Sequence, residues 1–211
     1  MDFKQAFTGH TVRRVAWKRR MAMLARWLHI YLSMASFAII FFFAITGLTL
    51  NHADRFTNQM RSVDEKGRLD TSWVRSPDTS HINKLAIVEY IRQNYHITAA
   101  VSDFRIDEVQ VTVSFKGPGY AADAFVNRQN GEYELTITNA GFVAIINDLH
   151  KGRDTGKSWS WFIDISAVLL ALVSLTGLLL LFFIKRKRAS GLIVAACGLL
   201  LGWLVYSIWI K

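Results

Sequence analysis

The chain has 211 residues, of which 52% are hydrophobic and only two are proline, and its mean hydropathy is +0.22. Such a composition is too apolar for a soluble globular domain of this length and excludes that class. The net charge of +9 does not indicate a nucleic-acid partner, because much of the excess lies in two clusters beside apolar segments, where membrane topology and anionic lipid headgroups account for it.

Three long segments contain no Asp, Glu, Lys or Arg, and they comprise residues 27–53, 165–184 and 189–210. About 20 apolar residues in a helix cross the ~30 Å of hydrocarbon in a bilayer, and a helix satisfies its own backbone hydrogen bonds there. The first segment is longer than the apolar part of a signal peptide, which has about 7–15 residues, so we interpret it as a retained anchor. We therefore predict transmembrane helices over residues 27–53, 161–184 and 189–210.

Clusters of positive charge flank these helices on one side. Lysines and arginines are concentrated in residues 1–26 and in the short loop 185–188. The positive-inside rule places both segments in the cytoplasm. Residues 54–160 then lie on the far side, which in a bacterium is the periplasm. We predict a multi-pass protein of the bacterial inner membrane, surrounded by the lipid bilayer, with a cytoplasmic N-terminus.

The segment between the first two membrane helices has the pattern of a small α+β domain. Residues 54–80 are polar and predict a loop with a short helix. Apolar residues then recur at three- and four-residue intervals, which predicts a helix; they are Ile82, Leu85, Val88, Ile91 and Tyr95. The only cysteine, Cys197, lies in the third membrane helix, so the domain depends on its own core for stability.

Alternating apolar residues after position 108 indicate about four antiparallel strands. One turn is expected at Gly117-Pro118-Gly119, and Asn130-Gly131 is a strong hairpin signal. A last amphipathic helix follows, with apolar residues on one side; these are Phe142, Ile145, Ile146 and Leu149. The predicted order is helix, strands, helix.

Several motifs flank this domain. The first membrane helix begins Trp27-Leu28-His29 and ends Thr46-Gly47-Leu48-Thr49-Leu50-Asn51-His52, the second is preceded by Asp148-Leu149-His150-Lys151-Gly152-Arg153, and Thr-Gly-Leu recurs at residues 176–178. With a helix-and-meander domain between them, the chain resembles the PepSY-associated transmembrane helix family over nearly its whole length. The resemblance implies an integral membrane α-helical protein with three transmembrane helices and an α+β PepSY-like periplasmic domain. Larger relatives resemble ferric-siderophore reductases and carry haem ligated by histidines at helix ends.

Three of the six histidines are candidate haem ligands. A histidine at the end of a membrane helix needs partners for its nitrogens and is a functional candidate. His52 ends the first helix, and His150 ends the last helix of the exported domain, so both are expected at the outer membrane face. Either they are the two axial metal ligands of one haem b iron, which the family resemblance favours, or each is an interfacial imidazole hydrogen-bonded to loop backbone or lipid headgroups. His29 is 23 residues from His52, about 34 Å along a helix, and cannot bind the same iron.

For His29 two alternatives remain, because no other membrane helix contains a histidine. It is either structural or a ligand of a second haem, completed by a partner subunit or by the second chain of a homodimer. The histidines at positions 10, 81 and 96 have polar neighbours and are expected on the surface. A flavin site, a nicotinamide site and a catalytic triad are not visible.

Other polar and small residues beside these histidines have two interpretations each. Asn51, Asp148 and Arg153 are candidates to hydrogen-bond the ligands, and Arg153 or Lys151 to pair with haem propionates, although ordinary surface polarity is as good an account. Gly47 and Gly177 favour close helix packing, with room for a flat porphyrin as the alternative.

Two functions remain open. The first is an inner-membrane b-type haem electron-transfer protein, a component of a membrane haem oxidoreductase that supports reduction of a periplasmic ferric chelate or of a partner reductase subunit. With two protein ligands on the iron, the expected chemistry is one-electron transfer. The alternative is a non-catalytic, membrane-anchored PepSY interaction module that binds a peptidase or another envelope partner.

Overall fold

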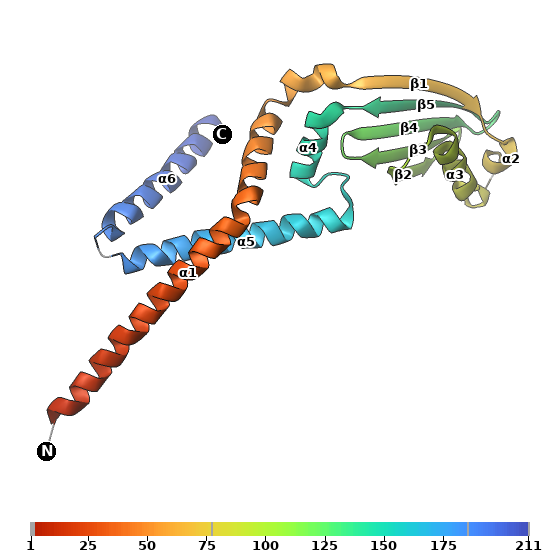
Figure 1. Cartoon of the computed structure of the whole chain (residues 1–211). Helices are drawn as coiled ribbons and strands as arrows, with labels where there is room; N and C mark the ends of the chain where they lie inside the picture. The colour runs from red at the N-terminus through yellow and green to blue at the C-terminus, as the bar shows by residue number, and fades with distance from the viewer. Residues whose placement is uncertain (1–2, 77, 185, 211) are drawn as a thin grey trace. The chain divides into compact units, whose positions relative to one another are not determined.

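A computed structural model of the chain describes residues 3–76, 78–184 and 186–210, except for the side chains of residues 3–15, 57 and 58. Figure 1 shows its elements in chain order. The chain divides into two compact units, one made of Met1–Ile40 with Asp164–Lys211 and the other of Phe41–Ile163. Each unit is described by itself below.

Three helices in the described part of the chain are long and apolar enough to cross a membrane. They are the stretch Ala16–Asn51 of α1 (Phe3–Asn51), α5 (Gly156–Phe183) and α6 (Arg188–Trp209). The prediction of three membrane helices is therefore confirmed, and the chain is a multi-pass membrane protein. α5 begins at Gly156, ahead of the expected start at residue 161.

The unit Phe41–Ile163 contains a five-stranded antiparallel sheet in the order β1-β5-β4-β3-β2. Its strands are β1 (Arg61–Arg68), β2 (Ala100–Ile106), β3 (Gln110–Gly117), β4 (Tyr120–Asn127) and β5 (Glu132–Asn139). The two turns expected from sequence join β3 to β4 and β4 to β5, so both hairpins are confirmed. The α+β class of the domain is confirmed as well.

One strand lies where the sequence predicted a loop. β1 pairs with β5 along eight residues, from Arg61 opposite Asn139 to Arg68 opposite Glu132. Its side chains are almost all exposed, so no apolar alternation marks it. Backbone pairing with a strand some 70 residues later stabilises it, and a local pattern cannot reveal that. The same segment also holds α2 (Thr71–Val74) and two 3-10 helices, Ala53–Gln59 and Thr79–His81.

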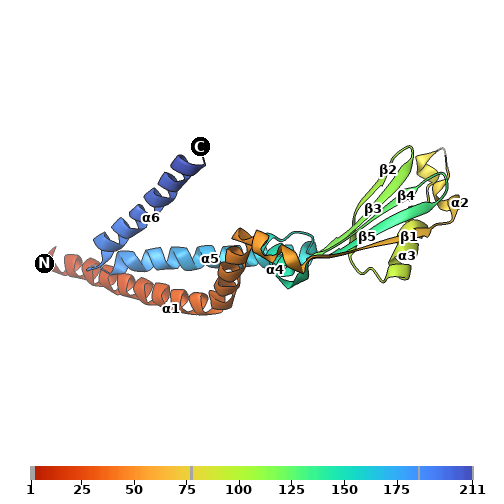
Figure 2. The ribbon, with the colours of Figure 1, turned by 90° about the horizontal axis from the view of Figure 1, so that it is seen from above.

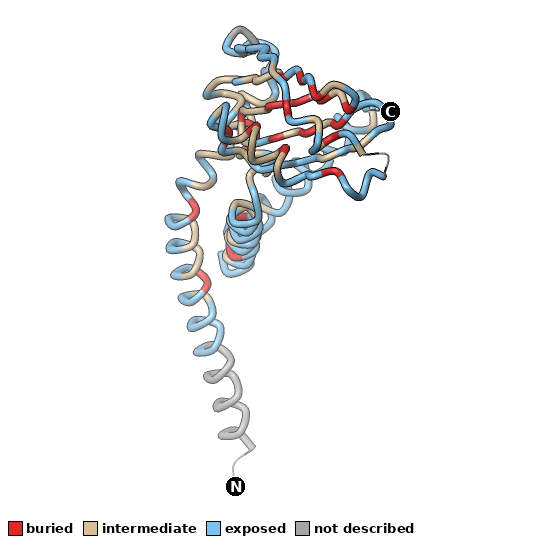
Figure 3. Tube along the Cα trace, turned by 90° about the vertical axis from the view of Figure 1, so that its right-hand side faces the viewer, coloured by how far each residue is buried: buried red, intermediate tan, exposed pale blue. Residues whose placement is uncertain are grey.

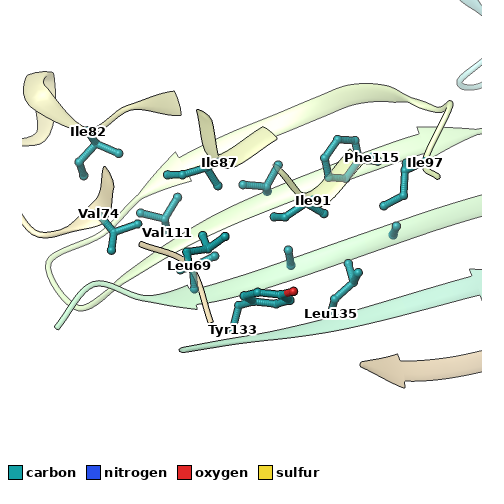
Figure 4. Packing of buried hydrophobic residues seen from close by; sticks show 14 residues of the cluster. Leu69, Val74, Ile82, Ile87, Ile91, Ile97, Val111, Phe115, Tyr133 and Leu135 are labelled. Atoms are coloured by element: carbon teal, nitrogen blue, oxygen red, sulfur yellow. The ribbon is translucent and has the colours of Figure 1, made fainter. Parts of the chain in front are cut away.

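The helix α3 (Lys84–Tyr95) packs on one face of the sheet (Figure 2), and Val74 of α2 joins the same core. The predicted helix is confirmed, but its buried face is rotated: Ile87 and Ile91 are fully buried, whereas Leu85 is 71% exposed. Figure 4 shows how the side chains of α3 pack on those of the strands, among them Val111, Phe115 and Leu135. Apolar burial of this kind, about 25 cal/mol per Å², is the main stabilising term for the domain.

α4 (Gly141–Lys151) packs on the turn between β3 and β4. The backbone of Gly119 has φ +64°, and a Cβ there would lie 2.5 Å from Ile145 Cγ1, so only glycine fits under the helix. The predicted helix is confirmed, yet the residues it buries are Asn147 and Asp148, while Phe142 remains 70% exposed. The contacts of these two polar residues fix the end of α4, where His150 lies.

Candidate functional site

His150 lies in the last turn of α4 and contacts the outer part of α1, within the unit Phe41–Ile163. Its Nδ1 is hydrogen-bonded to Thr46 Oγ1 at 2.6 Å. The ring meets Phe43 edge to face with centroids 5.1 Å apart, and a Cβ at Gly47 would lie 3.5 Å from His150 Cε1. The imidazole therefore lies against α1 at Gly47, where the helix has no side chain.

Three hydrogen bonds hold the end of α4 in place. The Thr49 hydroxyl of α1 donates to Asn147 Oδ1 at 2.8 Å. The Gly119 amide donates to Asp148 Oδ2 at 2.9 Å, and Arg153 donates to Asp148 Oδ1 at 2.7 Å. Because hydrogen bonds to a buried carboxylate are strong, they fix the last turn of α4 and the His150 backbone with it. Asp148 and Arg153 thus form an ion pair near the histidine. The sequence indicated each of them as a candidate but did not predict that they pair.

His29 has the same kind of neighbour in the other unit. Its Nδ1 lies 3.0 Å from Thr176 Oγ1 and 3.2 Å from the carbonyl oxygen of Val173, both on α5. A Cβ at Gly177 would lie 3.1 Å from His29 Cε1, which is tighter than ordinary van der Waals contact. The ring of His29 therefore lies against α5 where a glycine follows a threonine.

The two histidine sites share one construction. In each, Nδ1 binds the hydroxyl of a threonine, and Cε1 lies against the glycine that follows it. The Nε2 atoms of both rings make no hydrogen bond with any described residue. The Thr-Gly repeat at residues 46–47 and 176–177 is thus the partner of two histidines. The sequence favoured close helix packing for these glycines, and what approaches them is an imidazole ring.

His52 differs from the other two candidates. It follows the last residue of α1 and is partly buried, and its backbone amide donates to the Thr49 carbonyl. Its side chain makes no hydrogen bond with the described residues, and the side chains that contact the His150 ring belong to Thr46 and Phe43. The pairing of His52 with His150 on one iron stays a prediction.

The remaining histidines are not part of either site. His81 and His96 are exposed, as expected, and the side chain of His10 lies outside the described residues. No group of three or more His, Cys, Asp and Glu side chains in the described part of the chain has the arrangement of a metal site.

Sequence analysis missed Thr46, Thr176 and Asn147 as partners of the site. The sequence does contain one indication of these partners. Thr-Gly-Leu occurs twice, and the candidate histidines other than His52 are also two, His29 and His150. Nothing local in the chain, however, indicates which threonine meets which histidine. The bonded pairs are 147 and 104 residues apart in sequence.

Comparison with known proteins gives one match. The model of the family described as "Putative PepSY_TM-like" matches residues 23–211, which include all three membrane helices, the sheet domain and both histidine sites. No curated protein and no solved structure matches the chain.

Proposed function

Because the chain belongs to the PepSY_TM-like family of membrane proteins, we propose that it is a b-type haem protein of the bacterial inner membrane that transfers single electrons. The observation that carries this proposal is the common geometry of His29 and His150. Each lies beside a membrane helix with Nδ1 hydrogen-bonded and Nε2 free of hydrogen bonds to the described residues. That is the state in which a histidine serves as an iron ligand.

The residues present fit a haem. Gly177 keeps a side chain away from the edge of the His29 ring, since a Cβ there would stand 3.1 Å from Cε1, and at Gly47 a Cβ would be in ordinary contact with the His150 ring at 3.5 Å. His150 and His29 would hold the group, and His52 would be the second histidine at the His150 site. A second ligand for the His29 site would come from a partner subunit or from a second copy of the chain.

A haem with two histidine ligands supplies one-electron redox chemistry. The role of the chain is to orient the imidazoles, to keep water away from them and to provide counter-charges. Lys151 and Arg153 lie one and three residues after His150 and are suited to bind carboxylates such as propionates. Arg153 is 63% exposed while it binds Asp148, so its remaining N–H groups can donate to a second carboxylate.

The predicted membrane topology indicates the direction of electron transfer. The cationic loop around Arg186 and the cationic N-terminal part of α1, up to Arg26, belong in the cytoplasm by the positive-inside rule. The sheet domain and His150 then lie in the periplasm, and His29 near the cytoplasmic face. We propose that a donor inside the cell reduces the protein and that a periplasmic ferric chelate or a partner reductase accepts the electron.

The proposal is tested by purifying the full-length protein in mild detergent from haem-replete cells and recording oxidised and dithionite-reduced spectra with a pyridine haemochrome assay. We expect a sharp reduced α band and at least about one haem per chain. Replacing His150 or His29 with alanine should lower the haem content, and His52→Ala tests the predicted second ligand. His81→Ala is the matched control, because His81 is exposed and should not affect haem.

Full haem content in both His150→Ala and His29→Ala would contradict the proposal. A colourless protein that stays colourless after haem reconstitution would contradict it too. The chain would then be a membrane-anchored interaction module, and the full-length protein should be used to capture a peptidase or another envelope partner.

A further inference from the structure

The two threonine hydroxyls that contact the histidines have only one hydrogen each. Thr46 Oγ1 donates to the Phe42 carbonyl four residues earlier, at 2.7 Å. Thr176 Oγ1 donates to the Leu172 and Val173 carbonyls, at 2.8 and 2.9 Å. With the hydrogen directed at its own helix, each hydroxyl can offer the imidazole only a lone pair.

The imidazole nitrogen that faces each threonine must therefore be the donor. At His29 a second contact leads to the same conclusion, since Nδ1 also lies 3.2 Å from the Val173 carbonyl oxygen, which can only accept. A neutral imidazole carries one N–H. If that hydrogen is on Nδ1, the lone pair is on Nε2.

We propose that Thr46 and Thr176 are positioning residues that hold His150 and His29 in the Nδ1-protonated tautomer, so that Nε2 is presented as the ligand atom; the role of Nε2 as a haem ligand rests on the proposed function above. Gly177 contributes to the same arrangement, because a Cβ there would stand 3.1 Å from His29 Cε1, which is tighter than ordinary contact. Each threonine thus sets the protonation of one imidazole, and Gly177 also allows the close approach of His29.

A purely structural role for the hydroxyls is the competing account, because Ser and Thr in membrane helices often bond to the carbonyl four residues earlier. The chain contains a control for it. Ser174 of α5 donates to the Leu170 carbonyl at 3.0 Å, is exposed, and contacts no histidine. Ser174→Ala therefore removes a bond of the same kind from the same helix without touching either site.

The first test uses the haem-free full-length protein in detergent, labelled with ¹⁵N at histidine, so it does not depend on haem binding. We expect His29 and His150 to be protonated at Nδ1 in the native protein and in the serine variants Thr46→Ser and Thr176→Ser. In Thr46→Val, His150 should lose this state, because Nδ1 has no other hydrogen-bond partner among the described residues. In Thr176→Val, the Val173 carbonyl still accepts from His29 Nδ1 at 3.2 Å, so His29 should keep this state, and Ser174→Ala should change neither ring. Nε2 protonation of both rings in the native protein, or an unchanged His150 tautomer in Thr46→Val, would overturn the inference.

The second test uses the haem-loaded protein. Loss of a hydrogen-bond partner behind a metal ligand weakens binding by about 10- to 100-fold, so we expect the valine variants to bind haem that much more weakly and at a more positive midpoint potential, with serine restoring both. Unchanged affinity and potential in the valine variants would overturn the inference. If instead no variant and no native protein binds haem while the tautomers respond as expected, the proposed function fails and the control of the tautomer by threonine stands.

Discussion

The sheet domain and the membrane helices bury opposite kinds of side chain. In the sheet domain the fully buried residues are large and apolar, such as Ile91, Phe115 and Leu135. In the membrane helices the large apolar residues are exposed, and the buried ones are small or polar; these are Ala25, Ser36, Thr46, Ser166 and Thr176. Figure 3 shows the contrast, with buried positions concentrated in the strands and sparse along the helices.

The difference follows from the two solvents. Water drives apolar side chains into the interior of the sheet domain, whereas lipid is as apolar as leucine and gives no such drive. Helices in lipid instead approach through small residues and pair their polar groups with one another. The interior of the sheet domain therefore carries stability, and the buried positions of the membrane helices carry the contacts to His29 and His150.

The largest effect is expected in the core of the sheet domain. Phe115 is fully buried, and Phe115→Ala should lower the free energy of unfolding of the domain by about 3–5 kcal/mol through lost burial and a cavity. Hydrogen exchange of the sheet amides in the detergent-solubilised protein measures this change. Leu199→Ala is the control, since Leu199 is 79% exposed on a membrane helix; an equal loss in both variants would break the comparison.

Removal of the buried carboxylate beside the histidine should have the next largest effect. Asp148→Ala leaves the Gly119 amide without its acceptor, and an unpaired buried donor costs about 1–3 kcal/mol. We expect faster hydrogen exchange at the Gly119 amide and in the last turn of α4. Asp107→Ala should not change either, because Asp107 is exposed. Unchanged exchange in Asp148→Ala would mean that water replaces the carboxylate.

Substitutions of three glycines test how closely the histidine rings pack against the helices. A Cβ at Gly177 would lie 3.1 Å from His29, one at Gly47 3.5 Å from His150, and one at Gly198 in open space. We expect Gly177→Ala to destabilise its helix contact by about 1 kcal/mol, Gly47→Ala by less, and Gly198→Ala not at all. Thermal unfolding and the histidine ¹⁵N spectrum report the change, and the reverse order would contradict the geometry.

The smallest effect concerns alkaline pH. Burial raises the pKa of Tyr133 above its usual value of 10.0, and the hydrogen bond with Tyr95 at 2.9 Å raises it further. Above pH 10 the unfolded chain ionises at this tyrosine while the folded one does not. The stabilisation is therefore complete below pH 10 and is lost as pH rises toward the folded pKa.

Tyr133→Phe should remove part of that alkaline loss, at the expense of about 1 kcal/mol at neutral pH for the lost hydrogen bond. Unfolding of the full-length protein between about pH 8 and 11 measures both effects. The same slope of stability against pH in the native protein and in Tyr133→Phe would contradict this prediction.

Much of the fold was predictable from local patterns. Charge-free segments identified the three membrane helices, turn residues located both hairpins, and the motifs around His29, His52 and His150 indicated the family. Hydropathy, turn chemistry and motif spacing are properties of a few neighbouring residues, and for that reason a sequence read alone predicts them.

Tertiary structure decided what depends on distant partners. β1 is a strand because β5 pairs with it. Ile87 rather than Leu85 is buried because of the direction from which α3 meets the sheet. Each Thr-Gly pair contacts a histidine because another helix brings the ring to it. Composition and periodicity determined which segments enter the membrane and which form the domain. Which threonine meets which histidine was settled only by contacts between residues more than a hundred positions apart, which no local pattern encodes.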